Sequence, residues 1–259
     1  MLRTAGITVL GVLLFLGSQP AARADSVAYL YTVSQQFGTL DLNTGVFTNL
    51  GNSDILLSGL GVGPGGNLYG GRDHGSVLYQ VNLANGHLTT IGEGSVPYWD
   101  IGSTTSGLYG LGNSSEDLAL FSVNPSTGAT TVIGYTGLGL QGSTISLSTG
   151  SGRLYFSDGT NLYSLNTTTG APTLIGDTGL NIEAMVFENG VLWAGSYPGN
   201  AVYTLDPTTG AATFVANTSG GATEFWGLAP HPPTATPEPS SIVLLATGLL
   251  GLEAIAGRR

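Results

Sequence analysis

Acidic and aromatic side chains occur together at positions where they could bind a ligand. The candidate binding residues are Tyr98, Trp99, Asp100, Glu183, Glu224 and Trp226. Carboxylate oxygens can hold Ca²⁺, and aromatic rings beside them can stack on sugar rings, because they present a flat apolar face with polar edges nearby. The alternative is that the aromatic rings pack in the core and the acids are solvated.

Histidine and cysteine offer little for catalysis in this chain. There is no Cys, so disulfides, thiolate metal ligands and thiolate nucleophiles are excluded. The three His residues do not have the H-E-x-x-H spacing of a metal site. Arg72, Asp73 and His74 resemble a reactive trio, but neighbouring side chains point in different directions and cannot all converge. We therefore predict no catalytic residue and no metal ligand.

The elements that position these residues belong to an internal repeat. A motif such as YSLNTTTG, residues 163–170, occurs five times, and its closing glycines lie 40 to 42 residues apart. These glycines are Gly45, Gly86, Gly128, Gly170 and Gly210. A period of this length indicates structural units that cannot bury their own apolar faces and must stack on their neighbours.

Each repeat predicts four short β-strands. In residues 163–176, Tyr163 and Leu165 alternate with polar residues, a turn follows from Asn166 to Gly170, and a return strand ends at Gly176. Two further apolar segments precede each hairpin, as in residues 183–188 and 191–195. Four strands in about 41 residues correspond to one blade of a β-propeller.

The two ends of the repeat region complement each other. Residues 224–230 match only the first strand of a blade, whereas residues 27–33 match a second strand that has no first. We predict an all-β domain over residues 25–230, a five-bladed propeller of four-stranded antiparallel blades closed by pairing of these N- and C-terminal strands. Pairing would remove the free sheet edges. An open β-repeat array is the alternative.

The N-terminal segment is typical of a secretory signal peptide, which we predict over residues 1–24. Arg3 supplies the positive charge, residues 7–16 form the apolar core, and Ala22 and Ala24 fit the cleavage site of signal peptidase. An uncleaved anchor is the alternative.

The C-terminal segment changes composition after Pro230. Residues 231–241 are rich in proline and predict an extended linker. Residues 242–259 predict a hydrophobic helix with a basic end, in which the fifteen apolar residues 242–256 are few for a bilayer span. Arg258 and Arg259 are expected to stay on the cytoplasmic side.

Pro237, Glu238 and Pro239, followed by IVLLATGLLGLEAIAGRR, resemble the PEP-CTERM sorting tail of exported proteins of Gram-negative bacteria that make exopolysaccharide. The resemblance implies that an exosortase in the inner membrane recognises the motif, cuts near it and releases the body to the cell surface or extracellular matrix. Glu253 inside the apolar run and a basic end of only two arginines depart from the pattern. An ordinary C-terminal anchor is the alternative.

The charge of the chain limits its partners. The chain has six basic and sixteen acidic residues, and between the predicted processing signals only Arg72 and Arg153 are basic. This excludes nucleic acid, whose phosphates are bound by Lys and Arg, and argues against ion pairing with an acidic polysaccharide unless divalent cations bridge the two.

We therefore predict a noncatalytic extracellular protein associated with exopolysaccharide or a biofilm matrix, which binds glycan through a propeller face. No cofactor is predicted, with Ca²⁺ in the central channel as the alternative. The competing function is a secreted propeller enzyme of the lactonase or quinoprotein type, with a metal in the channel. Such enzymes resemble this chain at the level of the fold, which does not decide function.

Overall fold

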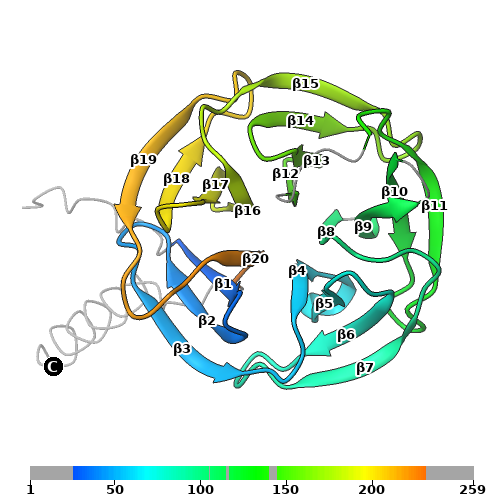
Figure 1. Cartoon of the computed structure of the whole chain (residues 1–259), viewed down its shortest axis with the longest axis horizontal. Helices are drawn as coiled ribbons and strands as arrows, with labels where there is room; N and C mark the ends of the chain where they lie inside the picture. The colour runs from blue at the N-terminus through cyan, green and yellow to red at the C-terminus, as the bar shows by residue number, and fades with distance from the viewer. Residues whose placement is uncertain (1–25, 105, 115–116, 140–144, 232–259) are drawn as a thin grey trace, which may run out of the picture.

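The computed structural model describes residues 26–104, 106–114, 117–139 and 145–231. Twenty strands and one 3-10 turn, Pro64–Gly66, are assigned there. The strands form five antiparallel sheets of four strands, arranged in a ring around a central channel (Figure 1). The predicted five-bladed propeller is confirmed. The segments expected to be the signal peptide, most of the linker and the C-terminal helix lie outside the described residues.

Each blade runs from an innermost strand at the channel to an outermost strand at the rim. Blade 1 contains β20 (Phe225–Pro230), β1 (Val27–Thr32), β2 (Gln36–Asp41) and β3 (Phe47–Asn52). Blade 2 contains β4 (Leu57–Val62), β5 (Leu68–Arg72), β6 (Val77–Val81) and β7 (Leu88–Glu93). Blade 3 contains β8 (Asp100–Thr104), β9 (Gly107–Ser114), β10 (Asp117–Val123) and β11 (Thr130–Tyr135). Blade 4 contains β12 (Ser146–Gly150), β13 (Arg153–Ser157), β14 (Asn161–Leu165) and β15 (Pro172–Asp177). Blade 5 contains β16 (Ile182–Glu188), β17 (Val191–Ser196), β18 (Ala201–Leu205) and β19 (Ala212–Asn217).

Two connections close the ring between the ends of the chain. Strand β20 pairs with β1, with Leu30 opposite Leu228 and Ala28 opposite Pro230, and it packs between the inner strands β16 and β4. At the rim, Ser219 bonds to blade 1 by donating its N–H to the carbonyl of Gly45 at 3.0 Å and accepting the N–H of Phe47 at 3.1 Å. The ring is therefore closed, and the open array is excluded.

The hydrophobic core lies between blades rather than within them. In the cluster between blades 1 and 5, Leu30 and Phe225 of blade 1 pack with Val186 and Trp193 of blade 5. The clusters of the other junctions likewise combine residues of two adjacent blades. Because no blade buries its apolar faces alone, the stability of each blade depends on its neighbours.

The repeated turn motif has one conformation in all five blades. In blade 4, Asn166 accepts the N–H of Thr168 on its side-chain oxygen at 2.8 Å, and its carbonyl accepts the N–H of Gly170 at 2.8 Å. Gly170 has a φ of +75°, a value that glycine adopts without steric cost. Equivalent turns begin at Asp41, Asn82, Asn124 and Asp206.

These turns pack against the outer strand of the preceding blade, which explains a second recurring glycine. A Cβ added to Gly134 in β11 would lie 2.0 Å from the carbonyl oxygen of Thr169, and one added to Gly170 would lie 2.8 Å from the carbonyl carbon of Gly134. The same close approach of hairpin and outer strand occurs at Gly51, Gly92 and Gly176. The repeat therefore encodes contact between blades as well as the turn itself.

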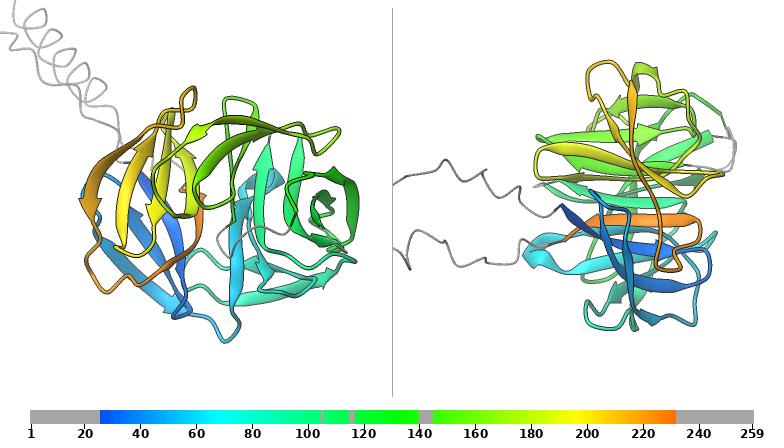
Figure 2. Two further views of the ribbon diagram at one scale, coloured as in Figure 1. Left: turned by 45° about the horizontal axis from the view of Figure 1, so that its top comes forward. Right: turned by 90° about the vertical axis from the view of Figure 1, so that its left-hand side faces the viewer.

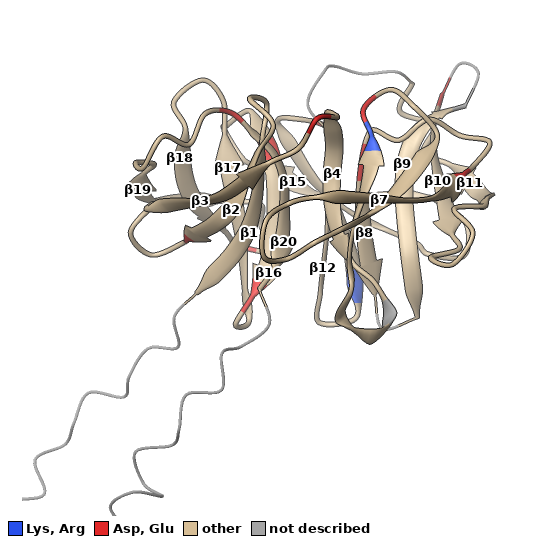
Figure 3. Cartoon of the chain, turned by 90° about the horizontal axis from the view of Figure 1, so that it is seen from below, with Lys and Arg blue, Asp and Glu red and all other residues tan. Residues whose placement is uncertain are grey.

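The ends of the described body and the candidate site lie on opposite faces of the ring. The inner strands all begin on one face and end on the other. Because Ala28 pairs with Pro230, both ends of the described body leave the ring on the face where β20 ends (Figures 2 and 3). The candidate site lies at the opposite face.

Candidate functional site

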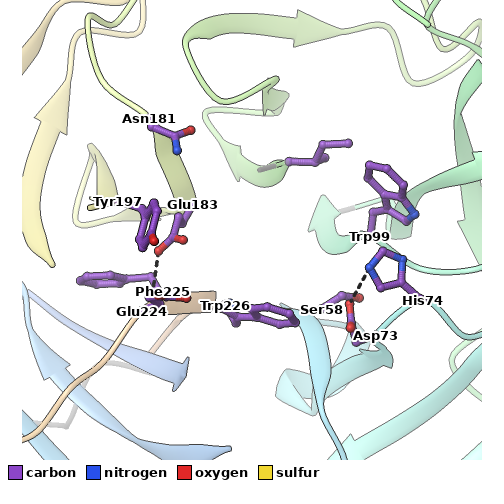
Figure 4. Close-up of a pocket in the computed structure, with 11 residues that line it drawn as sticks. Ser58, Asp73, His74, Trp99, Asn181, Glu183, Tyr197, Glu224, Phe225 and Trp226 are labelled. Atoms are coloured by element: carbon purple, nitrogen blue, oxygen red, sulfur yellow. Dashed lines mark hydrogen bonds and ion pairs between the residues drawn. The ribbon is translucent and has the colours of Figure 1, made fainter. Parts of the chain in front are cut away.

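A cavity of about 450 Å³ occupies the mouth of the central channel, where the inner strands begin. Its walls come from the starts of these strands and from the connections beside them. The lining residues are Ser58, Asp73, His74, Trp99, Ile145, Asn181, Glu183, Tyr197, Glu224, Phe225 and Trp226. In Figure 4, Glu183, Tyr197 and Asn181 lie on one side, Trp99 and His74 on the other, and Trp226 between them.

Glu183, at the start of β16, is the cavity-lining acid whose pKa is raised by a large amount. Its Oε2 atom accepts a hydrogen bond from the backbone N–H of Phe225 at 3.1 Å, which fixes the carboxyl group at the junction of blades 5 and 1. Burial raises its pKa to about 7; the bond from Phe225 partly opposes this rise, and the nearby charge of Glu224 adds to it. Glu183 can therefore be protonated or ionised near neutral pH.

Glu224 and Trp226 enter the cavity from the closing strand. Glu224 directly precedes β20, and its carbonyl accepts the N–H of Val33 at 3.2 Å, which extends the pairing with blade 1. Trp226 is partly buried and packs against the apolar cluster between blades 1 and 2. The backbone pairing that closes the ring thus also positions an acid and an indole in the cavity.

The opposite wall combines an indole, an imidazole and an acid. The rings of Trp99 and His74 meet edge to face with centroids 5.7 Å apart. His74 Nε2 lies 3.7 Å from Asp73 Oδ1. Burial raises the pKa of Asp73, and His74 opposes the rise. Arg72 of the same sequence trio does not line the cavity.

Of the six candidate residues, Trp99, Glu183, Glu224 and Trp226 line the cavity, whereas Tyr98 and Asp100 do not. Tyr98 is fully buried, and its ring fills the space that Gly71 leaves open: a Cβ on Gly71 would lie 2.4 Å from it. Burial raises the pKa of Tyr98. Tyr98 and Asp100 are both buried, so Trp99 alone of these three neighbours lines the cavity.

Asp100 is 5% exposed and connects two blades. Its Oδ1 accepts the N–H of Ile101 at 2.6 Å, and its Oδ2 accepts the N–H of Leu147, on β12, also at 2.6 Å. Burial raises the pKa of Asp100 well above its ordinary value, and the two hydrogen bonds oppose the rise. Both oxygens are thus engaged by backbone donors, and the carboxyl group holds β8 against β12.

Sequence reasoning did not place several of the lining residues. Asp73 and His74 follow β5, a second strand, which runs antiparallel to β4 and so ends at the face where β4 begins. Tyr197 and Asn181 belong to connections flanking β16 and β17, where the N–H of Tyr197 donates to the carbonyl of Asn181 at 2.9 Å. Because first and second strands run antiparallel, residues that follow a second strand lie beside residues that precede a first strand. This pattern was the only signal in the sequence for Asp73, His74, Asn181 and Tyr197.

The acidic side chains at the cavity do not form a metal-binding cluster with other described residues. Within the ranges that the structure describes, no three His, Asp or Glu side chains approach closely enough to hold a metal ion.

No helix in the described ranges is long and apolar enough to cross a membrane.

Comparison with known proteins identifies the tail of the chain. Residues 235–259 match the PEP-CTERM protein-sorting motif. The sorting tail predicted from Pro237, Glu238 and Pro239 is thereby confirmed. The motif implies export, recognition by an exosortase and a C-terminal tail anchored in the membrane. A comparison with curated proteins finds no match to the sequence.

Solved structures resemble the propeller body at low sequence identity. A chain of a nidogen/laminin complex has 15% identity over 79% of this chain and 80% of that one, with a TM-score of 0.56. The calcium-binding protein regucalcin from Agrobacterium tumefaciens has 21% identity, coverages of 81% and 76%, and a TM-score of 0.50. A glutaminyl cyclase from Myxococcus xanthus has 20% identity, coverages of 79% and 85%, and a TM-score of 0.47. At these identities the likeness concerns the fold alone.

Proposed function

We propose that this protein is a surface-displayed, noncatalytic binding protein that takes a saccharide of the extracellular matrix into the cavity at the channel mouth. The observation that carries the proposal is the placement of aromatic rings on different sides of one cavity with acids between them (Figure 4). Its volume of about 450 Å³ falls in the range of small-ligand sites.

Sugars and this cavity are chemically complementary. The C–H face of a sugar ring is apolar and packs on the flat indoles of Trp99 and Trp226, while its hydroxyl groups donate to carboxylates. Glu183 is already oriented by the N–H of Phe225. Its second oxygen accepts no hydrogen bond from the residues that the structure describes, so a ligand hydroxyl can use it.

The location of the cavity supports display on a surface. β20 begins at the cavity with Phe225 and Trp226 and ends at Pro230, from which the chain continues toward the sorting motif. The cavity therefore lies on the face opposite to the one on which β20 ends. A body held at the membrane through its tail would present this cavity outward.

Replacing an aromatic residue of the cavity by alanine tests the proposal. Tyr197 lines the cavity and is 41% exposed, so Tyr197→Ala removes a stacking surface with little effect on the core. Phe214→Ala is the matched control, because Phe214 is 53% exposed and lies on β19 at the rim. On a glycan array probed with the purified full-length protein in detergent, we expect Tyr197→Ala to weaken binding about tenfold, from a loss of about 1–1.5 kcal/mol, and Phe214→Ala to leave it unchanged. The absence of any glycan ligand, or equal effects of the two variants, would refute the proposal.

One observation favours a second candidate, hydrolysis of a glycosidic bond. Glycosidases pair a carboxylic acid of raised pKa with a second carboxylate, and Glu183, whose pKa is about 7, lies close enough to Glu224 for their charges to interact. Chromatography of an array-positive oligosaccharide after prolonged incubation decides between the two. Intact oligosaccharide supports binding, and shortened products that disappear in Glu183→Gln support hydrolysis.

A further inference from the structure

We infer that the cavity selects a positively charged saccharide, an amino sugar whose amine is free and protonated, over the neutral or N-acetylated form of the same sugar. This inference rests on the proposed saccharide binding and specifies the chemistry of its ligand. The charges of the cavity, its aromatic walls and the orientation of Glu183 support it.

The cavity has an excess of negative groups. Three carboxyl groups, those of Asp73, Glu183 and Glu224, line it. Within the part of the chain that the structure describes, the only Lys or Arg residues are Arg72 and Arg153, and neither lines the cavity. The one lining side chain that can become cationic is His74, which is 70% exposed and lies beside Asp73 on the wall opposite Glu183 (Figure 4).

The aromatic walls favour the same sign of charge. The face of an indole or phenol ring carries negative potential and attracts an ammonium group, most strongly where water is excluded. Trp99, Tyr197 and Trp226 border the space that Glu183 faces (Figure 4). A neutral sugar would use only the apolar character of these rings, whereas a sugar ammonium would use their electrostatic potential as well.

Glu183 is the group best placed to receive the ammonium. Its position is set by the backbone N–H of Phe225, so the carboxyl group is held before the ligand arrives. Burial and the neighbouring Glu224 disfavour its negative charge in the empty cavity and raise its pKa. An ammonium bound there would offset both effects through its charge as well as its hydrogen bond, whereas a neutral hydroxyl group would offset them only through a hydrogen bond. The other titratable groups at the cavity are Asp73, His74, Glu224 and Tyr197.

Calorimetric titration of the purified full-length protein in detergent tests the inference, with all probes compared at one pH, first at one ionic strength and then at higher salt. The probes are a β-1,4-linked glucosamine trimer, its fully N-acetylated counterpart, a glucose trimer of the same linkage, and spermidine as an amine without a sugar. We expect the glucosamine trimer to bind at least tenfold more tightly than the two neutral trimers and spermidine. The preference should decrease as salt is added, because salt screens charge.

Two glutamates on the same strand provide a matched pair of variants. Glu183→Gln should reduce the preference for the glucosamine trimer about tenfold and change the affinity for the neutral trimers less than twofold. Glu188→Gln makes the same substitution at the other end of β16, outside the cavity, and should leave all affinities unchanged. Circular dichroism of both variants establishes that they are folded.

The outcomes separate the two proposals. Equal binding of the charged and neutral trimers would overturn the charge selection and leave saccharide binding intact. Binding of spermidine as tight as that of the glucosamine trimer would overturn the assignment to a sugar. Binding of no saccharide at all would overturn the proposed function itself.

Discussion

Two glutamates at opposite ends of β16 should make the propeller less stable as the pH rises from 5 to 8. Burial raises the pKa of both Glu183 and Glu188 from an ordinary value of 4.5 to about 7. Between these values the folded protein holds protons that the unfolded chain has released. The free energy of unfolding therefore decreases with increasing pH, and the decrease is complete above the folded-state pKa.

The size of the effect follows from the shift. One pKa unit corresponds to about 1.4 kcal/mol, so a rise from 4.5 to about 7 would correspond to about 3 kcal/mol for a fully desolvated group. Glu183 is partly exposed and solvent screens its interactions, which reduces the expected loss to about 1–2 kcal/mol. Burial raises the pKa of Asp100 and of Asp73 as well, so these groups act in the same direction.

Urea unfolding at pH 5, 6, 7 and 8, followed by tryptophan fluorescence, measures this loss. We expect the wild-type unfolding midpoint to fall over this range, and Glu183→Gln to remove about 1–2 kcal/mol of the pH dependence. Glu93→Gln is the control, because Glu93 is exposed at the end of β7. A wild-type stability that is constant or rises from pH 5 to 8, or a Glu183→Gln variant with the wild-type slope, would refute the reasoning.

Two further predictions concern the blade junctions and the tail. Gly170→Ala should cost about 3 kcal/mol in urea unfolding, because it combines a φ of +75° with overlap onto Gly134; Gly179→Ala has a similar φ of +68° but no atom within 4 Å and should cost about 1 kcal/mol. Equal costs would show that contact between blades adds nothing. Replacing both Pro237 and Glu238 by Ala should leave full-length protein in the membrane fraction, and unchanged processing on immunoblots would contradict the role of the motif.

The ring could be predicted because every blade repeats the same local chemistry. The turn requires a side-chain oxygen at its first residue and a positive φ at its last, and residues such as Asn166 and Gly170 meet both needs. Residues 224–230 match a first strand without a second, and residues 27–33 match a second strand without a first, which indicated how the ring closes. Local propensity and global fold agree, which is why a single sequence was sufficient here.

The cavity could be predicted only in part because it depends on which way each side chain faces. Trp99 and Asp100 are adjacent, and the sequence does not tell which of them faces the channel. The answer depends on Leu147 in the next blade, whose backbone N–H binds the Asp100 carboxyl group. Likewise, His74 lines the cavity and has a φ of +49°, a conformation that its sequence context does not indicate.

Strand β20 joins the cavity to the tail, and this has a mechanical consequence. A ligand fixed in the matrix would hold Trp226 at one end of the strand, while a membrane-held tail would hold Pro230 at the other. Tension between them would act along the strand, over about 20 Å at 3.3 Å per residue. The covalent backbone of the strand would carry this tension. Only the part of the load that the other walls of the cavity take up would pass through its hydrogen bonds to β1, and it would load them in shear. As long as the tail stays in the membrane, the strand that completes the fold would thus also connect the bound ligand to the cell.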